Sequence, residues 1–313
     1  MQLSTPHAFS VTTSADYVDY GLYVGYVAIY TGRAYKRPGA ASIVIPTNDI
    51  ARRLMWQTMP SIETKAVVTA GVRVTVKLDL YITGVLTDTV TYYYDQCYDT
   101  SYDVTTSGGA APVNGIVDRR QSIVYTPYKA AAMTATVTRQ NGTTTTQSFA
   151  SSSDMNRNLV LPLWASALAN AAKVTLGGAT YYVRDTCARW ALYYLNALGG
   201  WDTLVMQGRP RETDRITRRT DQVLDGLTER SRNWANDWTK VLTLNTGLLS
   251  DDEAARMHHL LESTDVWLCD LTTRAMHPAV LTASECRYRT LATEGSPVSY
   301  DVEVEYAVGR TRR

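Results

Sequence analysis

The sequence lacks most of the features that mark secreted, membrane-spanning or disulfide-stabilised proteins. Among its 313 residues, four scattered cysteines occur, and none forms a Cys-x-x-Cys pair: Cys97, Cys187, Cys269 and Cys286. This favours free thiols in a reducing compartment, with a single disulfide as the alternative. Residues 1–17 contain neither a basic nor an apolar segment, so we expect no secretory signal. No run approaches the ~18 apolar residues of a membrane span, so we expect a soluble protein.

An excess of charge of one sign is also missing. The formal net charge is +1, and charged residues make up 19% of the chain. Without a dominant field, long-range attraction to nucleic acid or to an anionic membrane is not expected. Phenylalanine is scarce, with 2 residues against 21 Tyr and 7 Trp. Tyr and Trp suit surfaces that become buried on assembly, but Tyr is also a common strand residue, and both interpretations stay open.

The chain has no sequence motif of nucleotide binding, serine hydrolases or zinc proteases. His258 and His259 are adjacent in a predicted helix, where neighbouring side chains diverge by about 100°, so they cannot chelate one ion together. Cys269 and His277 could form a thiolate pair, but the apolar run around Cys269 predicts a strand in which this residue packs. His277 with Pro278 is expected to open a turn. We expect no catalytic residue, cofactor or metal ligand.

Residues 1–165 predict a β-sandwich-like domain. Residues 17–30 are rich in Tyr and Val and predict a strand pair or a bulged strand, and residues 72–82 alternate with the period of a half-buried strand. A brief helix is expected over residues 47–56. Residues 133–149 predict a hairpin in which Asn141-Gly142 forms a type I′ turn.

Residues 166–313 predict an α+β domain, with an antiparallel sheet and one or two helices. Residues 173–183 predict a hairpin that turns at Gly177-Gly178, and a short helix is expected over residues 186–197. A strand follows over residues 201–206. For the two domains together, we expect a mainly β fold.

The last part of the chain gives the clearest local signals. Ser250 and Glu253 form a capping box before apolar residues at helical spacing, which predicts a helix. Residues 298–306 alternate between apolar and acidic side chains and predict a strand. An antiparallel partner for this strand is expected over residues 286–290, whose arginines would meet the glutamates.

The strongest basic cluster lies in residues 209–219, with acidic residues interleaved. Three interpretations stay open: a solvated, salt-bridged strand, a subunit interface, and a surface that contacts nucleic acid. Because Arg and Trp are enriched in interfaces, we treat these residues as the candidate assembly interface: Arg209, Arg211, Arg215, Arg218, Arg219 and Trp201.

Three segments of the C-terminal half, residues 190–205, 240–253 and 299–307, resemble structural tail proteins of bacteriophages and prophages of Bacteroidetes hosts. The resemblance implies a β-rich ring subunit of the tail tip, baseplate or tail hub, located in the virion. It also implies that the partners are copies of the chain and other tail proteins, and that no catalytic residues are present.

The leading functional hypothesis is therefore a homo-oligomeric structural component of a phage tail. The alternative is a carbohydrate- or receptor-binding β module, in which Tyr and Trp, such as Trp201 or Trp267, gather on one exposed face. An enzyme, such as a glycan hydrolase, would require two carboxylates in one cleft, about 5–10 Å apart.

Overall fold

The computed structural model describes residues 8–24, 27–47, 50, 59–69, 73–95, 114–126, 132–150, 157–197, 200–225, 228–282 and 299–306. The structure is 63% strand and 5% helix, which confirms the expectation of a mainly β protein. Within these ranges the strands form five sheets, and buried apolar side chains gather in four clusters. No helix in the described ranges is long and apolar enough to cross a membrane.

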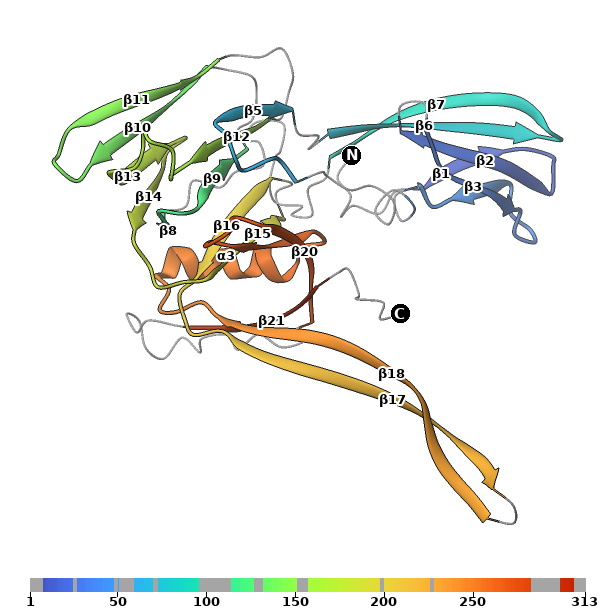
Figure 1. The fold of residues 1–313 in the computed structure, drawn as a ribbon. Helices are drawn as coiled ribbons and strands as arrows, with labels where there is room; N and C mark the ends of the chain where they lie inside the picture. Colours follow the sequence, from blue (N-terminus) through green and yellow to red (C-terminus); the bar gives the residue numbers. More distant parts are fainter. Residues whose placement is uncertain are drawn as a thin grey trace, which may run out of the picture.

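The N-terminal unit is a four-stranded sheet covered on one face by a two-stranded sheet (Figure 1). Its strands are β3 (Val27–Tyr35), β2 (Tyr17–Val24), β6 (Arg73–Ile82) and β7 (Val85–Asp95), in that spatial order, and β1 (Phe9–Thr12) paired with β4 (Ser42–Ile45). Alternation along β2 places Val18, Tyr20 and Leu22 in one core with Ile43 and Ile45 of β4.

Two predictions for this unit are confirmed. The strand pair predicted over residues 17–30 is formed by β2 and β3, with a register shift at Leu22/Tyr23, and residues 73–82 form a strand whose Val76, Leu78 and Leu80 are buried. The helix expected over residues 47–56 lies almost entirely outside the described residues.

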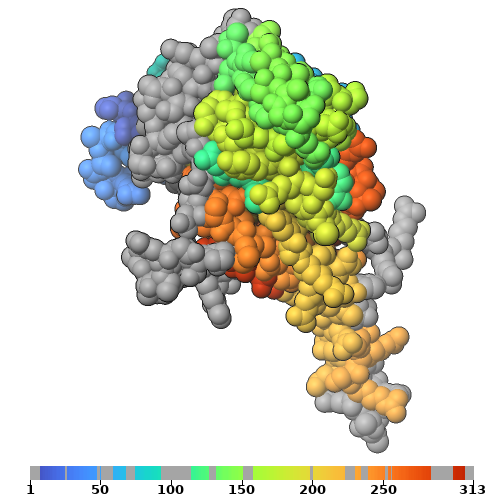
Figure 2. All heavy atoms as spheres, turned by 90° about the vertical axis from the view of Figure 1, so that its left-hand side faces the viewer, coloured from blue at the N-terminus to red at the C-terminus, as the bar shows by residue number. Residues whose placement is uncertain are grey.

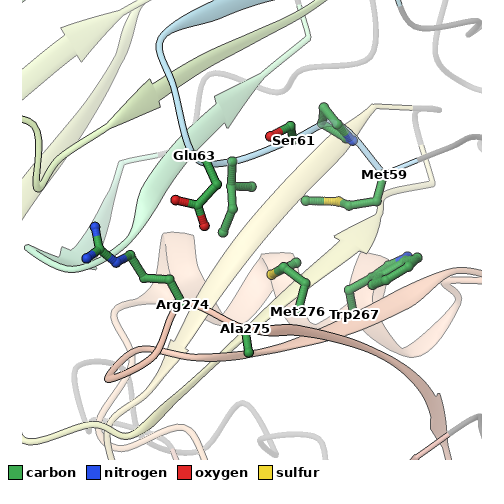
Figure 3. A pocket seen from close by; sticks show the side chains of 9 residues that line it. Met59, Ser61, Glu63, Trp267, Arg274, Ala275 and Met276 are labelled. Atoms are coloured by element: carbon green, nitrogen blue, oxygen red, sulfur yellow. The ribbon is translucent and has the colours of Figure 1, made fainter.

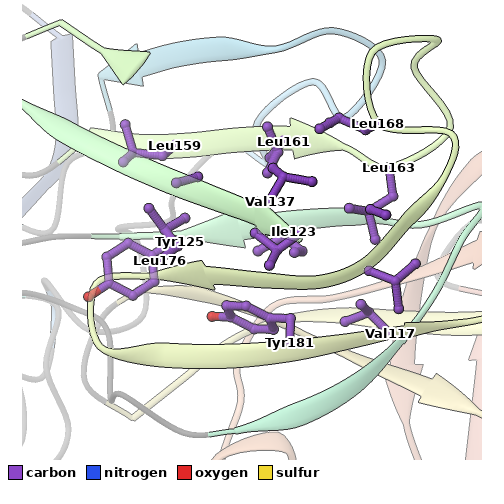
Figure 4. Close-up of a cluster of buried hydrophobic side chains, with 14 of the residues drawn as sticks. Val117, Ile123, Tyr125, Val137, Leu159, Leu161, Leu163, Leu168, Leu176 and Tyr181 are labelled. Atoms are coloured by element: carbon purple, nitrogen blue, oxygen red, sulfur yellow. The ribbon is translucent and has the colours of Figure 1, made fainter. Parts of the chain in front are cut away.

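The middle unit is built from a five-stranded and a three-stranded sheet that share one apolar core (Figure 4). The five strands, in spatial order, are β11 (Thr144–Phe149), β10 (Met133–Arg139), β13 (Ala171–Leu176), β14 (Ala179–Arg184) and β8 (Gly115–Asp118). The other sheet consists of β5 (Ala66–Thr69), β12 (Arg157–Pro162) and β9 (Ser122–Tyr125). The expected domain boundary at residue 165 falls inside this unit, since β10 pairs directly with β13.

The two hairpins of the middle unit differ in their turns. Gly177 and Gly178 have φ values of 60° and 88°, as the type I′ turn between β13 and β14 requires. In the other hairpin only Gly142 has a positive φ, 82°, and its N–H donates to the carbonyl of Arg139 at 3.0 Å. The loop is therefore a type I turn followed by a left-handed glycine, and the type I′ expectation for Asn141-Gly142 was wrong.

The C-terminal unit is a seven-stranded sheet with one helix. Its strands, in spatial order, are β16 (Trp201–Met206), β15 (Trp190–Leu195), β19 (Val266–Asp270), β20 (Met276–Leu281), β21 (Asp301–Tyr306), β18 (Thr228–Asn245) and β17 (Arg211–Asp225). Helix α3 (Asp251–Leu261) begins after Ser250 with the predicted capping box and packs Met257 and Leu260 on the sheet. The strand predicted over residues 201–206 is confirmed, and the one predicted over 298–306 is confirmed over Asp301–Tyr306, whereas residues 286–290 lie outside the described ranges.

Two local expectations for this unit were wrong. Residues 190–195, expected to be helical, form β15, and all six of its side chains are buried. This strand is covered on both faces, so its sequence is continuously apolar, and periodicity alone cannot distinguish it from a buried helix. His277 and Pro278 lie within β20 and do not open a turn; the imidazole stacks edge-on against the ring of Tyr306, with the centroids 5.6 Å apart.

The middle and C-terminal units are joined by hydrogen bonds between buried groups. The N–H of Ser122 donates to Tyr193 Oη at 3.0 Å, and the N–H of Ile116 donates to Glu253 Oε1 at 2.8 Å. Trp201 lies in a cluster that also contains Ile62 and Val124. These contacts cross from β8 and β9 to the large sheet and to α3, so the two units form one packed body.

Candidate assembly surface

The most distinctive surface of the molecule is a long two-stranded arm, formed by β17 and β18 between residues 211 and 245. The strands pair continuously from Arg211↔Thr243 to Asp225↔Thr228. Strand β21 accompanies β18 only over Val241–Asn245. Residues 214–240, which we call the free part of the arm, therefore extend from the body as a bare hairpin (Figures 1 and 2). At ~3.3 Å per residue, the twelve residues of β17 from Asp214 to Asp225 span about 40 Å.

The free part of the arm has no apolar core of its own among its described side chains. Where burial is described, the buried residues of β18 begin at Val241, and residues 211–222 of β17 are all exposed. Ile216, in register with Trp238, is 50% exposed. Charged residues make up 13 of the 35 residues between 211 and 245, against 19% of the whole chain. The sequence of this segment is thus typical of a surface that faces water or a polar partner.

Five of the six candidate interface residues lie on or beside this arm. Arg209 precedes β17, and Arg211, Arg215, Arg218 and Arg219 are exposed along it. Because side chains alternate along a strand, Arg211, Arg215 and Arg219 share one face, while Arg218 lies on the other. The structure therefore collects four of the arginines in one extended element.

Trp201 does not belong to this group. It is the first residue of β16, is 2% exposed and packs with Tyr193 and Cys269 in the sheet interior. The apolar pattern of residues 201–206 was the signal for this position, because a strand buried on both faces has few polar side chains. Trp201 is therefore a core residue that stabilises the sheet from which the arm extends, and it does not contact a partner directly.

Ion pairs hold the base of the arm to the sheet. Arg215 Nη1 lies 3.1 Å from Glu305 Oε1 of β21, and Lys240 Nζ lies 2.6 Å from Glu212 Oε2 of the paired strand. The hydrogen bond from Lys240 to Glu212 raises the pKa of Lys240. These pairs are largely exposed, so each contributes at most about 1 kcal/mol. They link the base of the arm to β21 and its two strands to each other, without supplying a core.

The backbone of the arm is open to further strand pairing. β17 is the last strand of the seven-stranded sheet, and no described strand pairs with its outer edge. The segment 211–245 contains no proline, the residue that most directly blocks pairing at an edge. Its frequent charges reduce non-specific aggregation, while they leave the N–H and C=O groups available to a matched partner.

A second candidate surface is a hollow of about 390 Å³ where the segment before β5 meets the turn between β19 and β20 (Figure 3). Met59, Trp267 and Met276 supply apolar lining, and Glu63 and Arg274 supply the charges. Trp267, the alternative candidate for glycan stacking, is thus half-buried in this hollow. Glu63 is the one carboxylate among the residues that line it, so the hollow does not provide the acid pair of a glycan hydrolase.

The histidines and cysteines do not form a recognisable reactive site in the described part of the chain. His258 and His259 lie next to each other on α3, and no three metal-ligating residues gather in the described ranges. Cys187 and Cys269 are free thiols; Cys97 and Cys286 lie outside the described residues. Burial, with the nearby carboxylates of Asp270 and Glu63, raises the pKa of Cys269 to about 12, which makes it a packing residue.

Comparison with protein-family models gives no match, and no curated protein matches the sequence. The geometry of the chain itself must therefore carry any functional argument.

Proposed function

We propose that this chain is a structural subunit of a multi-chain assembly, a homo-oligomeric component of a phage tail, in which the arm of each copy lies against a neighbouring subunit. The observation that carries the proposal is the free part of the arm, residues 214–240, which has no intramolecular partner beyond its own two strands among the described residues. The resemblance of residues 190–205, 240–253 and 299–307 to tail proteins suggests that this assembly is a phage tail.

The free part of the arm has little to stabilise it within a single chain. An isolated two-stranded ribbon is at best marginally stable in water, because it buries little apolar surface against the entropy of ordering its backbone. The described side chains of residues 211–222 are all exposed, so the single chain offers no compensating burial there. A neighbouring subunit that covers one face or pairs with one edge would supply it.

The size of the arm also fits an interface. Its free part contains 27 residues, and one side of a standard protein interface contributes roughly 20–30 residues. Seven Lys and Arg alternate with six Asp and Glu between residues 211 and 245. Such balanced charges select a register and a partner, whereas a nucleic-acid surface would carry a strong excess of positive charge.

The decisive experiment removes the arm without disturbing the sheet. Thr213 and Val241 are paired in register, so an Asn-Gly turn can join them directly in place of residues 214–240. We expect the full chain to form discrete oligomers in native mass spectrometry, and the shortened chain to remain folded by circular dichroism and to be monomeric.

A milder variant tests the arginines. Arg215→Ser with Arg219→Ser should weaken the oligomer, and the matched control, Arg139→Ser with Arg184→Ser in the sheet of the middle unit, should not. A full chain that stays monomeric at micromolar concentration, and binds no other tail protein, would contradict the proposal. Oligomers that persist after removal of residues 214–240 would show that another surface assembles the subunit.

A further inference from the structure

The outer face of the N-terminal sheet carries a group of tyrosines around a glycine. Alternation along β2 directs Val18, Tyr20 and Leu22 into the core, so Tyr17, Gly21 and Tyr23 lie on the opposite face. The register adds Tyr35 of β3 opposite Tyr17, and Tyr81 of β6 opposite Asp19. We call this surface, Tyr17, Tyr23, Tyr35 and Tyr81 around Gly21, the tyrosine face.

Gly21 allows the ring of Tyr23 to lie across the sheet. A Cβ atom at position 21 would lie 2.8 Å from Cε2 of Tyr23 and 3.1 Å from its Oη, too close for any residue other than glycine unless the ring moves. The ring thus covers the Gly21 backbone and does not project away from the sheet. It is half-buried, and Lys77 Nζ lies 5.6 Å from its centroid, so the part of the ring that meets water is bordered by this cation.

Polar groups surround this ring. The hydroxyl of Tyr23 is hydrogen-bonded to that of Tyr81, and this bond raises the pKa of Tyr81. The Asp79 carboxylate, opposite Gly21 in register, accepts hydrogen bonds from Thr89 Oγ1 at 2.7 Å and from Lys77 Nζ at 3.0 Å. Donors and acceptors therefore lie on both sides of a flat apolar ring.

The same arrangement continues towards the β3 edge. Arg33 lies over the ring of Tyr17, 4.0 Å from its centroid, and its guanidinium binds both carboxylate oxygens of Asp19, at 2.6 and 3.0 Å. Tyr35, whose ring centroid lies 6.2 Å from that of Tyr17, is 67% exposed. Aromatic surface and hydrogen-bonding groups thus alternate across three neighbouring strands.

The charges of the face compensate one another. Its two cations are paired with its two carboxylates, Arg33 with Asp19 and Lys77 with Asp79. The face therefore presents hydrogen-bonding groups without a net field, which is complementary to a neutral ligand and not to a polyanion. A protein surface that excluded water here would have to desolvate the exposed Arg33–Asp19 pair and the Lys77 ammonium. Sugar hydroxyls would replace that water as partners.

From this geometry we propose that the tyrosine face binds a neutral oligosaccharide. The axial C–H groups of a pyranose form a flat apolar surface that would stack on the Tyr23 ring, while the sugar hydroxyls bind Tyr81 and Lys77, the latter held in place by the buried Asp79. Tyr35, which is 67% exposed, provides a second contact for the next sugar along the chain. This site is separate from the arm and would function in an assembled subunit as well as in a single copy.

The test uses the full chain and a panel of soluble neutral hexasaccharides, built from glucose, mannose, galactose or N-acetylglucosamine. We expect isothermal titration calorimetry to show at least one that binds with a Kd on the order of 0.1–1 mM. Gly21→Ala should lift the Tyr23 ring and weaken binding by about tenfold or more, and Tyr23→Ala should do the same. Tyr81→Phe, which removes one hydroxyl and keeps the packing, should weaken it by about three- to tenfold.

The matched control is Tyr182→Ala. Tyr182 is 46% exposed on β14 of another sheet, so its loss should not change sugar binding. Absence of binding by every hexasaccharide, or binding that Gly21→Ala and Tyr81→Phe leave unchanged, would overturn the proposal. It would also fail if these variants changed the oligomeric state in native mass spectrometry instead, because the face would then be a contact between copies of the chain.

Discussion

Arg256 of helix α3 and Asp202 of strand β16 form an ion pair inside the C-terminal unit. The guanidinium Nε donates to Asp202 Oδ2 at 3.0 Å, and Nη2 donates to the carbonyl of Thr203 at 3.0 Å. The Arg256 side chain is 4% exposed. One turn earlier, Glu253 closes the capping box with Ser250 and accepts the N–H of Ile116. A single helical face thus joins α3 to both the large sheet and the middle unit.

Replacing Arg256 should therefore be severe. Arg256→Met keeps the unbranched stem of the side chain but leaves the Asp202 carboxylate without its partner in a largely buried position. We expect the free energy of unfolding to fall by about 3–5 kcal/mol, as when one partner of a buried ion pair is removed. Guanidinium chloride unfolding followed by tryptophan fluorescence measures this. The control, Arg215→Met, breaks an exposed pair with Glu305 and should cost at most about 1 kcal/mol. If both variants lost the same free energy of unfolding, the pair of Arg256 with Asp202 would contribute no more than an exposed ion pair, and this prediction would be wrong.

The sequence predicts well those elements that local physics determines. Ser250 with Glu253 predicts the start of α3, since a capping box satisfies backbone donors within one turn. Gly177-Gly178 predicts the turn between β13 and β14, because both positions need a positive φ. The alternation around Val302 and Val304 predicts β21, whose two faces differ in burial.

Tertiary burial determines the elements that the sequence did not predict correctly. Residues 190–195 are apolar on both faces because one face of β15 packs with Met257 and Leu260 of α3 and the other packs with Ile62 and Val124, so the two-residue period disappears. Trp201 looked like an interface residue and is a core residue of the same sheet. In the arm, polar residues occupy both faces of the strands, and the sequence predicts a polar strand there. It does not predict that the pairing of β18 with β21 ends at Val241, because that depends on the tertiary structure.

The two described cysteines should react very differently. Cys187 is exposed, whereas Cys269 is fully buried with its pKa raised to about 12. At pH 8 a thiol with that pKa is only about 0.01% thiolate, and iodoacetamide reacts with the thiolate. Labelling of the native protein, read by peptide mass spectrometry, should modify Cys187 and leave Cys269 intact. Unfolding in guanidinium chloride should expose both to the reagent. Rapid native modification of Cys269 would show that the core around Trp201 opens.

Asp118 should make the stability of the middle unit depend on pH. Burial alone would raise the pKa of this carboxyl, but hydrogen bonds from Arg120 and Thr186 lower it below the ordinary value. A lowered pKa in the folded state stabilises the fold fully above the unfolded pKa of ~3.9, and this contribution is lost as the pH falls through the folded value. Asp118→Asn should therefore destabilise the protein clearly at pH 7.

The difference between wild type and Asp118→Asn should shrink as the pH falls below about 4, in urea unfolding at several pH values. Asp185→Asn serves as the control, because this carboxylate is 74% exposed and its pair with Arg119 contributes little. If the difference stays constant down to about pH 3, the cost of Asp118→Asn comes from packing and not from the carboxylate charge.

Trypsin should distinguish the free arm from the assembled arm. Arg215, Arg218 and Arg219 lie on β17, and Arg230 and Arg232 on β18, all in a ribbon with no buried apolar residue among its described side chains. Such a ribbon opens at low free-energy cost, so the monomer should be cut first between residues 215 and 232 while the body resists. When the arm docks on a neighbouring subunit, the free energy of association is added to the free energy needed to open the ribbon. An addition of about 2.7 kcal/mol would slow cleavage roughly a hundredfold. Limited digestion of separated monomer and oligomer fractions, with the fragments identified by mass spectrometry, measures the ratio. Equal cleavage in both fractions would place the contacts between subunits somewhere other than the arm.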